Sequence, residues 1–400
     1  MDGIGCIMID SMYLVVAGGI SGFLVLVVLL TVRRMWPVFA YAYSNARISA
    51  MEARLLSISR IRDIGSQKSV EDGLGLLSGT DYAEIDDVDS GNCDMAFSQC
   101  FVRHISDVQK FSPKLSAPVA NYYLREWEIY NVLNAMRIVM NDIEIGKDDV
   151  CYNFVDVPAL GCKRMSDVIF SEDVASAVEK LKGTEYYRII DEYLRKYPEG
   201  KENPAMLDAM LDKYNILKLY EDGERSIVRR GFLRKRKQRI MNPVDSMVVR
   251  NFCALRADIL NIIVALRLIM EKADANENRE QFVPIGLFID TDKRDKLRMV
   301  DNVEEVLGIV AGTPYEEAFK NGFNEFRKSG KINGIVRRLD DFLLDYVRDM
   351  AQDYAFSIAV MLRYMALKRR EMILLRSIFK GIADDVRFDI DDDFRVVRED

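Results

Sequence analysis

The sequence predicts an all-α protein made of three repeated helical lobes, preceded by one N-terminal transmembrane helix. Two patterns that each occur three times in the same order indicate the repeat, and a long uncharged run indicates the membrane helix. Only nine prolines occur in 400 residues, which favours long helices over a strand-rich design. A chain of this length can bury two or three hydrophobic cores.

The first repeated pattern is an apolar helix that carries one arginine. Residues 131–140 read NVLNAMRIVM and residues 261–270 read NIIVALRLIM, so that Arg137 corresponds to Arg267. A looser third copy, RREMILLRSIFK, places Arg376 six residues after Arg370, as Arg137 and Arg267 follow Asn131 and Asn261. In each copy, the arginine is expected to pair with carboxylates of its own lobe; the alternative is that the three line an inner wall and meet a partner.

The second repeated pattern is G-T-x-Y, with the threonines Thr80, Thr184 and Thr313. Each copy follows an apolar helical pattern in which a valine precedes the threonine by ten residues. A glycine that ends one helix and a threonine that caps the next would explain the pattern, so the threonines are predicted N-caps. Together the two patterns predict a lobe of roughly 100 residues or more that occurs three times.

The uncharged run from Tyr13 to Val32 is long enough to cross a bilayer. Arg33 and Arg34 follow it directly, so the positive-inside rule places the rest of the chain on the cytoplasmic side of the cell membrane. A secretory signal peptide is the alternative. Its basic residues would precede the apolar run, and no small-residue cleavage site follows here.

After Pro37, residues 39–64 have the apolar periodicity of a long amphipathic helix. Its segment YAYSNARISAMEARLL, residues 41–56, resembles the opening helix of the C subunit of archaeal-type (V/A-type) ATP synthases, a family that includes the d subunit of vacuolar ATPases. The resemblance rests on Asn45, Ala46, Arg47, Met51, Arg54 and Leu55. Residues 364–381, YMALKRREMILLRSIFKG, are similar to the last-lobe pattern of the same family.

This resemblance implies a non-catalytic rotor subunit of a V/A-type ATP synthase, with three helical lobes in a funnel-like, pseudo-threefold arrangement. The partners it implies are the central shaft subunits and the membrane ring of ion-carrying subunits, between which such a subunit transmits torque. The expected divisions are an N-terminal segment, 1–36, and lobes at 37–150, 151–298 and 299–400, the last with an acidic tail. The N-terminal helix departs from the family, and a place in the ring lumen and one in lipid both stay open.

Motifs for catalysis or cofactor binding are not found in the sequence. The phosphate-binding pattern G-x-x-x-x-G-K-[ST] does not occur, so no nucleotide binding is expected. His104 is the only histidine, which leaves neither a histidine-dependent triad nor a zinc site to predict. The six cysteines form no C-x-x-C pair and are expected to be free thiols in a reducing compartment. We therefore predict no enzyme active site, no cofactor and no metal.

Residues 225–239 carry eight basic residues and no acidic one, although the whole chain has a formal charge of −7. That overall charge argues against nucleic-acid binding, as does the single aromatic residue in the run, Phe232. A solvated helix face is one interpretation. Contact with anionic lipid or an acidic partner is the other, through Arg229, Arg230, Arg234, Lys235, Arg236 and Lys237.

The alternative function is a membrane-anchored helical scaffold or adaptor unrelated to ATPases. The apolar run, the basic segment and the missing catalytic motifs fit that function equally well. The segment at residues 45–47 and the repeated lobe favour the ATP synthase role. An enzyme ranks third.

Overall fold

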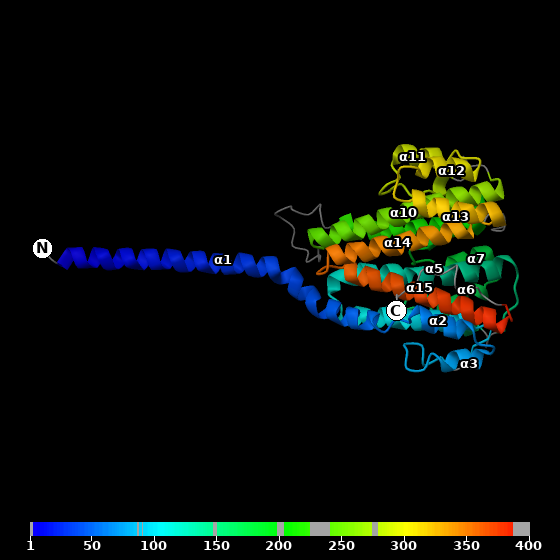
Figure 1. Cartoon of the computed structure of the whole chain (residues 1–400), viewed down its shortest axis with the longest axis horizontal. Helices are drawn as coiled ribbons and strands as arrows, with labels where there is room; N and C mark the ends of the chain where they lie inside the picture. Colours follow the sequence, from blue (N-terminus) through cyan, green and yellow to red (C-terminus); the bar gives the residue numbers. More distant parts are fainter. Residues whose placement is uncertain are drawn as a thin grey trace.

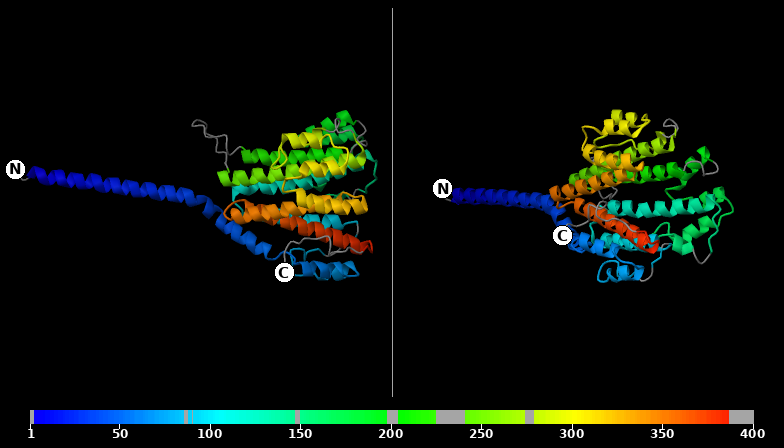
Figure 2. Two further views of the ribbon diagram at one scale, coloured as in Figure 1. Left: turned by 45° about the horizontal axis from the view of Figure 1, so that its top comes forward. Right: turned by 45° about the vertical axis from the view of Figure 1, so that its right-hand side comes forward.

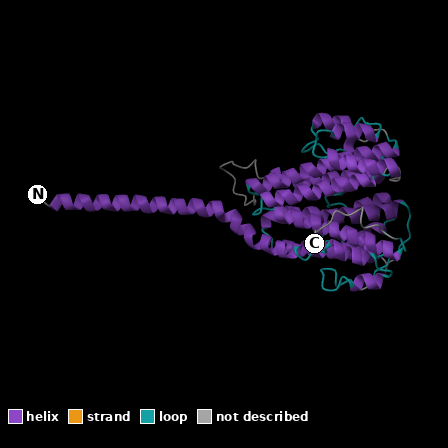
Figure 3. Ribbon diagram, in the orientation of Figure 1, coloured by secondary structure: helices purple, strands orange, loops and turns teal. Residues whose placement is uncertain are grey.

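The computed structural model describes residues 3–85, 88–89, 91–146, 150–197, 204–224, 241–273 and 279–386. Within these ranges the side chains of residues 3–18, 33–34, 36–38, 40 and 279 lie outside the description. All regular elements of the described chain are helices, and it contains no β-strand (Figure 3). The all-α part of the predicted fold class is therefore confirmed.

After the first helix, α1 (Gly3–Glu52), the elements follow one another in three similar successions. Each contains a pair of short α-helices followed by longer ones, and a short 3-10 helix opens the second and the third. The first contains α2 (Ile58–Gly65), α3 (Val70–Gly75), α4 (Cys93–Phe111), η1 (Lys114–Ser116) and α5 (Ala117–Met140). The second contains η2 (Val150–Asn153), α6 (Cys162–Ile169), α7 (Val174–Lys180), α8 (Tyr187–Lys196), α9 (Pro204–Glu224) and α10 (Pro243–Glu271). The third contains η3 (Arg279–Gln281), α11 (Thr291–Leu297), α12 (Val303–Val310), α13 (Glu316–Ser329), α14 (Asn333–Asp353) and α15 (Ala359–Ala383).

Three of the longer helices, α5, α10 and α15, each carry a pair of short helices. The pair α6 and α7 packs on α5, and the pair α11 and α12 packs on α10. The pair on α15 is α2 and α3, which come from the opposite end of the chain. Since α15 also packs against α1 and α4, the beginning and the end of the described chain meet in one bundle (Figure 1).

The short second helix of each pair begins at the same kind of cap. Ser69, Asp173 and Asn302 are the N-caps of α3, α7 and α12, and each side chain accepts a hydrogen bond from the backbone N–H three residues on. Such a cap satisfies one of the free N–H groups of the first turn. The valine that the sequence repeats ten residues before each G-T-x-Y threonine is the residue after this cap.

Helix α1 projects from the body over most of its length (Figures 1 and 2). Its C-terminal part lies in the body, where Tyr41 and Ile48 are buried in the core. The Tyr41 hydroxyl donates a hydrogen bond of 2.7 Å to Asp245, which attaches α1 to the start of α10. In the projecting part, large apolar side chains such as Phe23 and Leu29 are 65% and 60% exposed.

Among the residues described, no helix is long and apolar enough to cross a lipid bilayer. This finding corrects the predicted transmembrane helix at 13–32 and the predicted single-pass membrane localisation. Of that run, the side chains of residues 19–32 are described, while those of residues 13–18 lie outside the description.

The boundaries of the first helices also differ from the sequence prediction. Helix α1 continues through Pro37 and ends at Glu52, whereas the periodicity predicted a separate helix over 39–64. A turn follows, and Ser57 caps α2, with its side chain accepting the N–H of Arg60. The apolar spacing continues across this break, so the pattern alone does not reveal the turn.

The expectation of six free thiols is wrong for one pair. Cys151 and Cys162 form a disulfide, with 5.2 Å between their Cα atoms, whereas Cys93, Cys100 and Cys253 are free and buried. Cys151 lies in η2 and Cys162 begins α6, so the backbone between them folds back on itself. The two cysteines are 11 residues apart, a spacing that matches no short redox motif.

Gly322 lies where α13 and α14 approach each other closely. A Cβ atom at this position of α13 would lie 2.4 Å from the Ile335 Cα atom of α14. We expect Gly322→Ala to lower the free energy of unfolding by about 3 kcal/mol, because backbone atoms cannot move aside as a side chain can. Gly308→Ala in α12 is the matched control. It adds a methyl group in open space and should stabilise by about 0.5–1 kcal/mol. Urea unfolding checks both values, and equal effects would contradict the close-packing argument.

Candidate functional site

The three G-T-x-Y turns have the same backbone geometry. Gly79, Gly183 and Gly312 all have positive φ, at 75°, 83° and 73°. This left-handed region is open to glycine at little cost and strained for other residues, which explains why the pattern begins with glycine. The three turns therefore share a backbone conformation as well as a sequence pattern.

The three threonines close the turn that precedes them. The hydroxyl groups of Thr80, Thr184 and Thr313 each donate to the backbone carbonyl three residues earlier, at 2.6, 2.7 and 2.6 Å. The residues at the N-cap positions of α8 and α13 are Tyr186 and Tyr315. Thr184 and Thr313 thus bond back to the preceding helix and do not cap α8 or α13, although the sequence pattern suggested N-caps. The Thr80 hydroxyl bonds in both directions, since it also accepts the Tyr82 N–H at 3.2 Å.

The tyrosine of each turn donates a hydrogen bond to a carboxylate on a long helix. Tyr186 donates to Glu128 of α5 at 2.5 Å, and Tyr315 donates to Asp258 of α10 at 2.9 Å. Tyr82 donates to Glu371 of α15 at 2.9 Å, across 289 positions of sequence. Burial, with the adjacent carboxylate as a second cause, raises the pKa of all three tyrosines, so each hydroxyl keeps its proton and remains a donor.

Two of these carboxylates stand three residues before the repeated asparagines. Asn131 and Asn261 are fully buried, and the side-chain oxygen of each accepts a backbone N–H, from Val155 and Val283. Both side-chain amides also donate to the carbonyl of the same valine. The sequence analysis did not identify these carboxylates. An alignment of the two apolar helices could have identified them, because Glu128 and Asp258 both stand three residues before the aligned asparagines.

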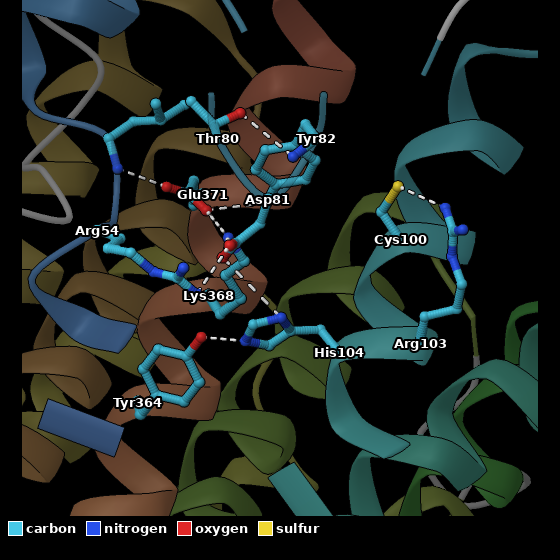
Figure 4. A network of polar contacts seen from close by, with 11 residues as sticks. Arg54, Thr80, Asp81, Tyr82, Cys100, Arg103, His104, Tyr364, Lys368 and Glu371 are labelled. Carbon is cyan, nitrogen blue, oxygen red and sulfur yellow. Dashed lines mark hydrogen bonds and ion pairs between the residues drawn. The ribbon is translucent and has the colours of Figure 1, made fainter. Parts of the chain in front are cut away.

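The contact between the two chain ends is a buried polar network, shown in Figure 4. Lys368 of α15 is at its centre and is 3% exposed. Its ammonium group lies 2.7 Å from Glu371 and 3.0 Å from Asp81, the third residue of the first G-T-x-Y turn. One buried cation therefore binds two carboxylates, of which one belongs to α15 and the other to the N-terminal part of the chain (Figure 4).

Two further contacts strengthen this joint. The backbone N–H of Leu56 donates to Glu371 at 2.6 Å, and the Arg54 guanidinium lies 3.2 Å from Asp81. Burial opposes the ionisation of Asp81, but the nearby cations, first of all Lys368, outweigh it and lower the pKa of this carboxyl group. We call Arg54, Leu56, Asp81, Tyr82, Lys368 and Glu371 the end-to-end joint.

His104 lies at the edge of the end-to-end joint. Its Nε2 atom is hydrogen-bonded to the Tyr364 hydroxyl, and its Nδ1 atom is 3.9 Å from Asp81 (Figure 4). Burial, followed by the charge of Lys368, lowers the pKa of His104 to about 4. The imidazole is therefore neutral near pH 7, and its contacts tie α4 to α15 without adding a charge.

The residues of the predicted signature helix lie at the start of the body. Asn45 is buried and donates to the carbonyls of Ala355 and Ser357, just before α15, at 2.9 and 3.2 Å. Leu55 is buried, Met51 is half-buried, and Ala46 and Arg47 are exposed. The Arg47 guanidinium lies over the Phe111 ring, with 4.3 Å from its central carbon to the ring centroid.

The three arginines of the repeated helices have different surroundings. Arg137 is exposed on α5, and Arg267 lies 3.6 Å from Asp208 of α9. Arg376 lies 2.9 Å from Asp94 of α4. Arg137 stands nine residues after Glu128, and Arg267 stands nine residues after Asp258. On α15 the residue nine positions after Glu371 is Lys380, so Arg376 is not the equivalent of the other two arginines.

A group of charged side chains lies where α5, α10, α14 and α15 approach one another. Arg369 of α15 binds Glu126 of α5 at 2.8 Å, and Arg256 of α10 lies 3.6 Å from Asp340 of α14. Glu126, Arg256 and Arg369 each stand two residues before the carboxylate that accepts a tyrosine hydroxyl on their helix. They line a cavity of about 40 Å³, which has room for a few water molecules.

The described residues include no group of three or more His, Cys, Asp or Glu side chains arranged to hold a metal ion. The predicted partner-contact residues Arg229, Arg230, Arg234, Lys235, Arg236 and Lys237 lie outside the described residues. The described polar contacts connect structural elements. The tyrosines attach the G-T-x-Y turns to the long helices, and the end-to-end joint attaches the N-terminal part of the chain to α15.

Comparison with known proteins identifies the family. The family described as ATP synthase (C/AC39) subunit matches residues 44–390. The A-type ATP synthase C subunit of Methanocaldococcus jannaschii is 22% identical over 353 residues, 87% of this chain and 84% of that protein. The A-type ATP synthase C subunit of Pyrococcus furiosus is 25% identical over 360 residues, 88% of this chain and 89% of that protein.

A third relative shows the same extent of similarity. The A-type ATP synthase C subunit of Thermococcus kodakarensis is 25% identical over 358 residues, which cover 88% of this chain and 90% of that protein. The matched region begins within the signature helix and includes all three G-T-x-Y turns and the whole end-to-end joint. The chain belongs to the ATP synthase (C/AC39) subunit family.

Proposed function

We propose that this protein is a non-catalytic central-stalk subunit of a V/A-type rotary ATP synthase. In this role it joins the central shaft to the membrane ring of ion-carrying subunits and transmits torque between them. The family match over residues 44–390 carries the proposal, since the relatives it resembles are named as the C subunits of A-type ATP synthases. No chemical step is assigned to the chain itself.

The contacts within the body suit a part that must transmit force. Packed protein interiors have low compressibility, so a twist applied at one end reaches the other with little loss. A body made of successive helical units could still open where the chain begins and ends. The end-to-end joint closes that gap with Lys368 and Glu371, which are 3% and 0% exposed.

We further propose that three copies of one helical unit make up the body, with divisions near 37–150, 151–298 and 299–400. The equal geometry of the three G-T-x-Y turns supports this proposal, as do the three tyrosine–carboxylate contacts. In this scheme each long helix supports the short helices of the following copy, and α15 supports those of the first. The body is then a closed ring of units.

Co-purification tests the proposed function. The full chain, produced together with the shaft and ring subunits of the same enzyme, is expected to co-purify with both and to bind no ATP in calorimetry. ATP binding tighter than the millimolar range would contradict the non-catalytic role. Failure to associate with either the shaft or the ring would contradict the proposed position in the stalk.

A variant of the end-to-end joint serves as the comparison in that experiment. Glu371→Ala is expected to weaken association with the shaft and ring, because an opened body no longer holds its surfaces in place. Glu84→Ala is the matched control, since Glu84 is 77% exposed in its pair with Arg103 and exposed pairs contribute little. Equal association of the two variants would contradict the mechanical role of the joint.

A further inference from the structure

The disulfide Cys151–Cys162 closes the segment that leads from α5 to α6. We call residues 150–162 the second strap. Cys151 is exposed, whereas Val155 and Leu160 within the strap are buried. The disulfide thus lies at the protein surface, at the two ends of a segment whose middle is anchored in the core. A reductant can reach it without unfolding the body.

The second strap holds two helices together. Asn131 of α5 donates to the carbonyls of Val155 and Leu160, at 2.7 and 2.8 Å. Gln99 of α4 accepts the Asp156 N–H at 2.7 Å and donates to the carbonyl of the same residue at 3.3 Å. Both α4 and α5 belong to the first succession of helices, and the strap leads into α6 of the second. It therefore attaches the second succession to the first.

The same place in the other two successions is held by a carboxylate. Asp258 accepts the backbone N–H groups of Leu287, Phe288 and Ile289, and Glu371 accepts that of Leu56. In the second succession Glu128 accepts the Tyr186 hydroxyl, and within the described chain no backbone N–H of the strap donates to it. A disulfide closes the segment between α5 and α6, whereas a carboxylate anchors the segment before α2 and the segment between α10 and α11.

The position of Cys162 favours cleavage of this disulfide. Cys162 is the first residue of α6, after the Gly161 N-cap, and Lys163 and Arg164 follow it. The free N–H groups at a helix N-terminus stabilise a thiolate. A stabilised thiolate is a good leaving group in thiol–disulfide exchange. Attack on the sulfur of the exposed Cys151 would release Cys162 as that leaving group.

We propose that Cys151 and Cys162 form a redox-active modification site, reversibly reduced by a dithiol, that sets the rigidity of the second strap. In the reduction, one thiolate of the dithiol attacks the Cys151 Sγ atom and the Cys162 thiolate leaves and takes up a proton. The second thiol of the reductant then attacks the mixed disulfide and releases Cys151. Two electrons and two protons pass to the protein, and the dithiol becomes a disulfide.

Thiol trapping tests whether the pair is redox-active in the folded protein. The full chain carrying Cys6→Ser is treated with a maleimide before and after incubation with dithiothreitol under native conditions. We expect no label on Cys151 or Cys162 before reduction and label on both afterwards, while Cys93, Cys100 and Cys253 stay unlabelled because they are buried. Label on both before any reductant, or on neither after it, would overturn the proposal.

Hydrogen exchange tests the effect on rigidity. Reduction is expected to raise the amide exchange rates of residues 150–154 and 161–164 at least tenfold, because the loop closure is lost. Residues 283–289, anchored by Asp258, are the internal control and should not change. Changes below twofold in the second strap would overturn the proposal. The Cys151→Ser/Cys162→Ser variant should match the reduced protein, and exchange as slow as in the oxidised protein would also overturn it.

Discussion

Replacing Glu371 with alanine is expected to lower the free energy of unfolding by about 3–5 kcal/mol, because it removes one partner from a buried ion pair. Glu371 is fully buried and accepts three hydrogen bonds, from Lys368, Tyr82 and the N–H of Leu56. Without it, the Lys368 ammonium keeps one carboxylate partner, Asp81, and the Tyr82 hydroxyl and the Leu56 N–H lose their acceptor. Urea unfolding of the variant and the parent protein measures the difference.

Two comparisons separate the charge of Glu371 from its hydrogen bonds. Glu371→Gln keeps an acceptor for Tyr82 and Leu56 and should cost less than alanine. In a double-mutant cycle, Lys368→Met combined with Glu371→Leu should cost less than the sum of the two single changes, since no buried charge is left unpaired. An effect of Glu371→Ala below 1 kcal/mol, as for an exposed pair, would contradict the joint.

Much of the helical content could be predicted from periodicity and from the small number of prolines. The three G-T-x-Y turns were found because glycine has a specific backbone role there, as the positive φ of Gly79, Gly183 and Gly312 shows. The threonines were predicted to cap the following helix, but Thr184 and Thr313 bond backward, and Thr80 bonds in both directions. A threonine between two helices can bond backward or forward, and four letters of sequence do not distinguish the two directions.

The end-to-end joint could not be predicted from the sequence. Sequence order groups Tyr82 with the helices that follow it, whereas its carboxylate partner, Glu371, lies 289 positions away. A repeated sequence pattern shows which helices are equivalent, but it does not show which long helix packs against which pair of short helices. The pattern favoured an arginine match at Arg376, and only the contact with Tyr82 points to Glu371 as the counterpart of Glu128 and Asp258.

The disulfide and the N-terminal helix show two other limits of sequence reasoning. Cys151 and Cys162 meet because Asn131 folds the strap between them back on α5, a tertiary contact that no cysteine spacing indicates. For the first helix, hydropathy predicted a membrane span. Within the described residues, no helix meets the length and apolarity that a span requires.

Replacing Asp258 with alanine is expected to cost about 3–5 kcal/mol and to release the strap between α10 and α11. One oxygen of this buried carboxylate accepts the N–H groups of Leu287, Phe288 and Ile289 at 2.9, 2.7 and 3.1 Å, and the Tyr315 hydroxyl at 2.9 Å. Each buried donor left without an acceptor costs about 1–3 kcal/mol, although the costs do not add fully. Urea unfolding gives the total, and amide exchange of residues 287–289 shows whether the strap is released.

The second succession of helices offers a matched comparison for Asp258. Glu128→Ala removes the counterpart carboxylate but frees only the Tyr186 hydroxyl, so it should cost about 1–2 kcal/mol and leave exchange in residues 150–162 unchanged while the disulfide is intact. Tyr315→Phe should likewise cost about 1–2 kcal/mol and leave the three N–H bonds in place. If Glu128→Ala lowered the free energy of unfolding as much as Asp258→Ala, the three backbone hydrogen bonds of Asp258 would add no measurable stability. The tyrosine contact, which both share, would then be the dominant interaction.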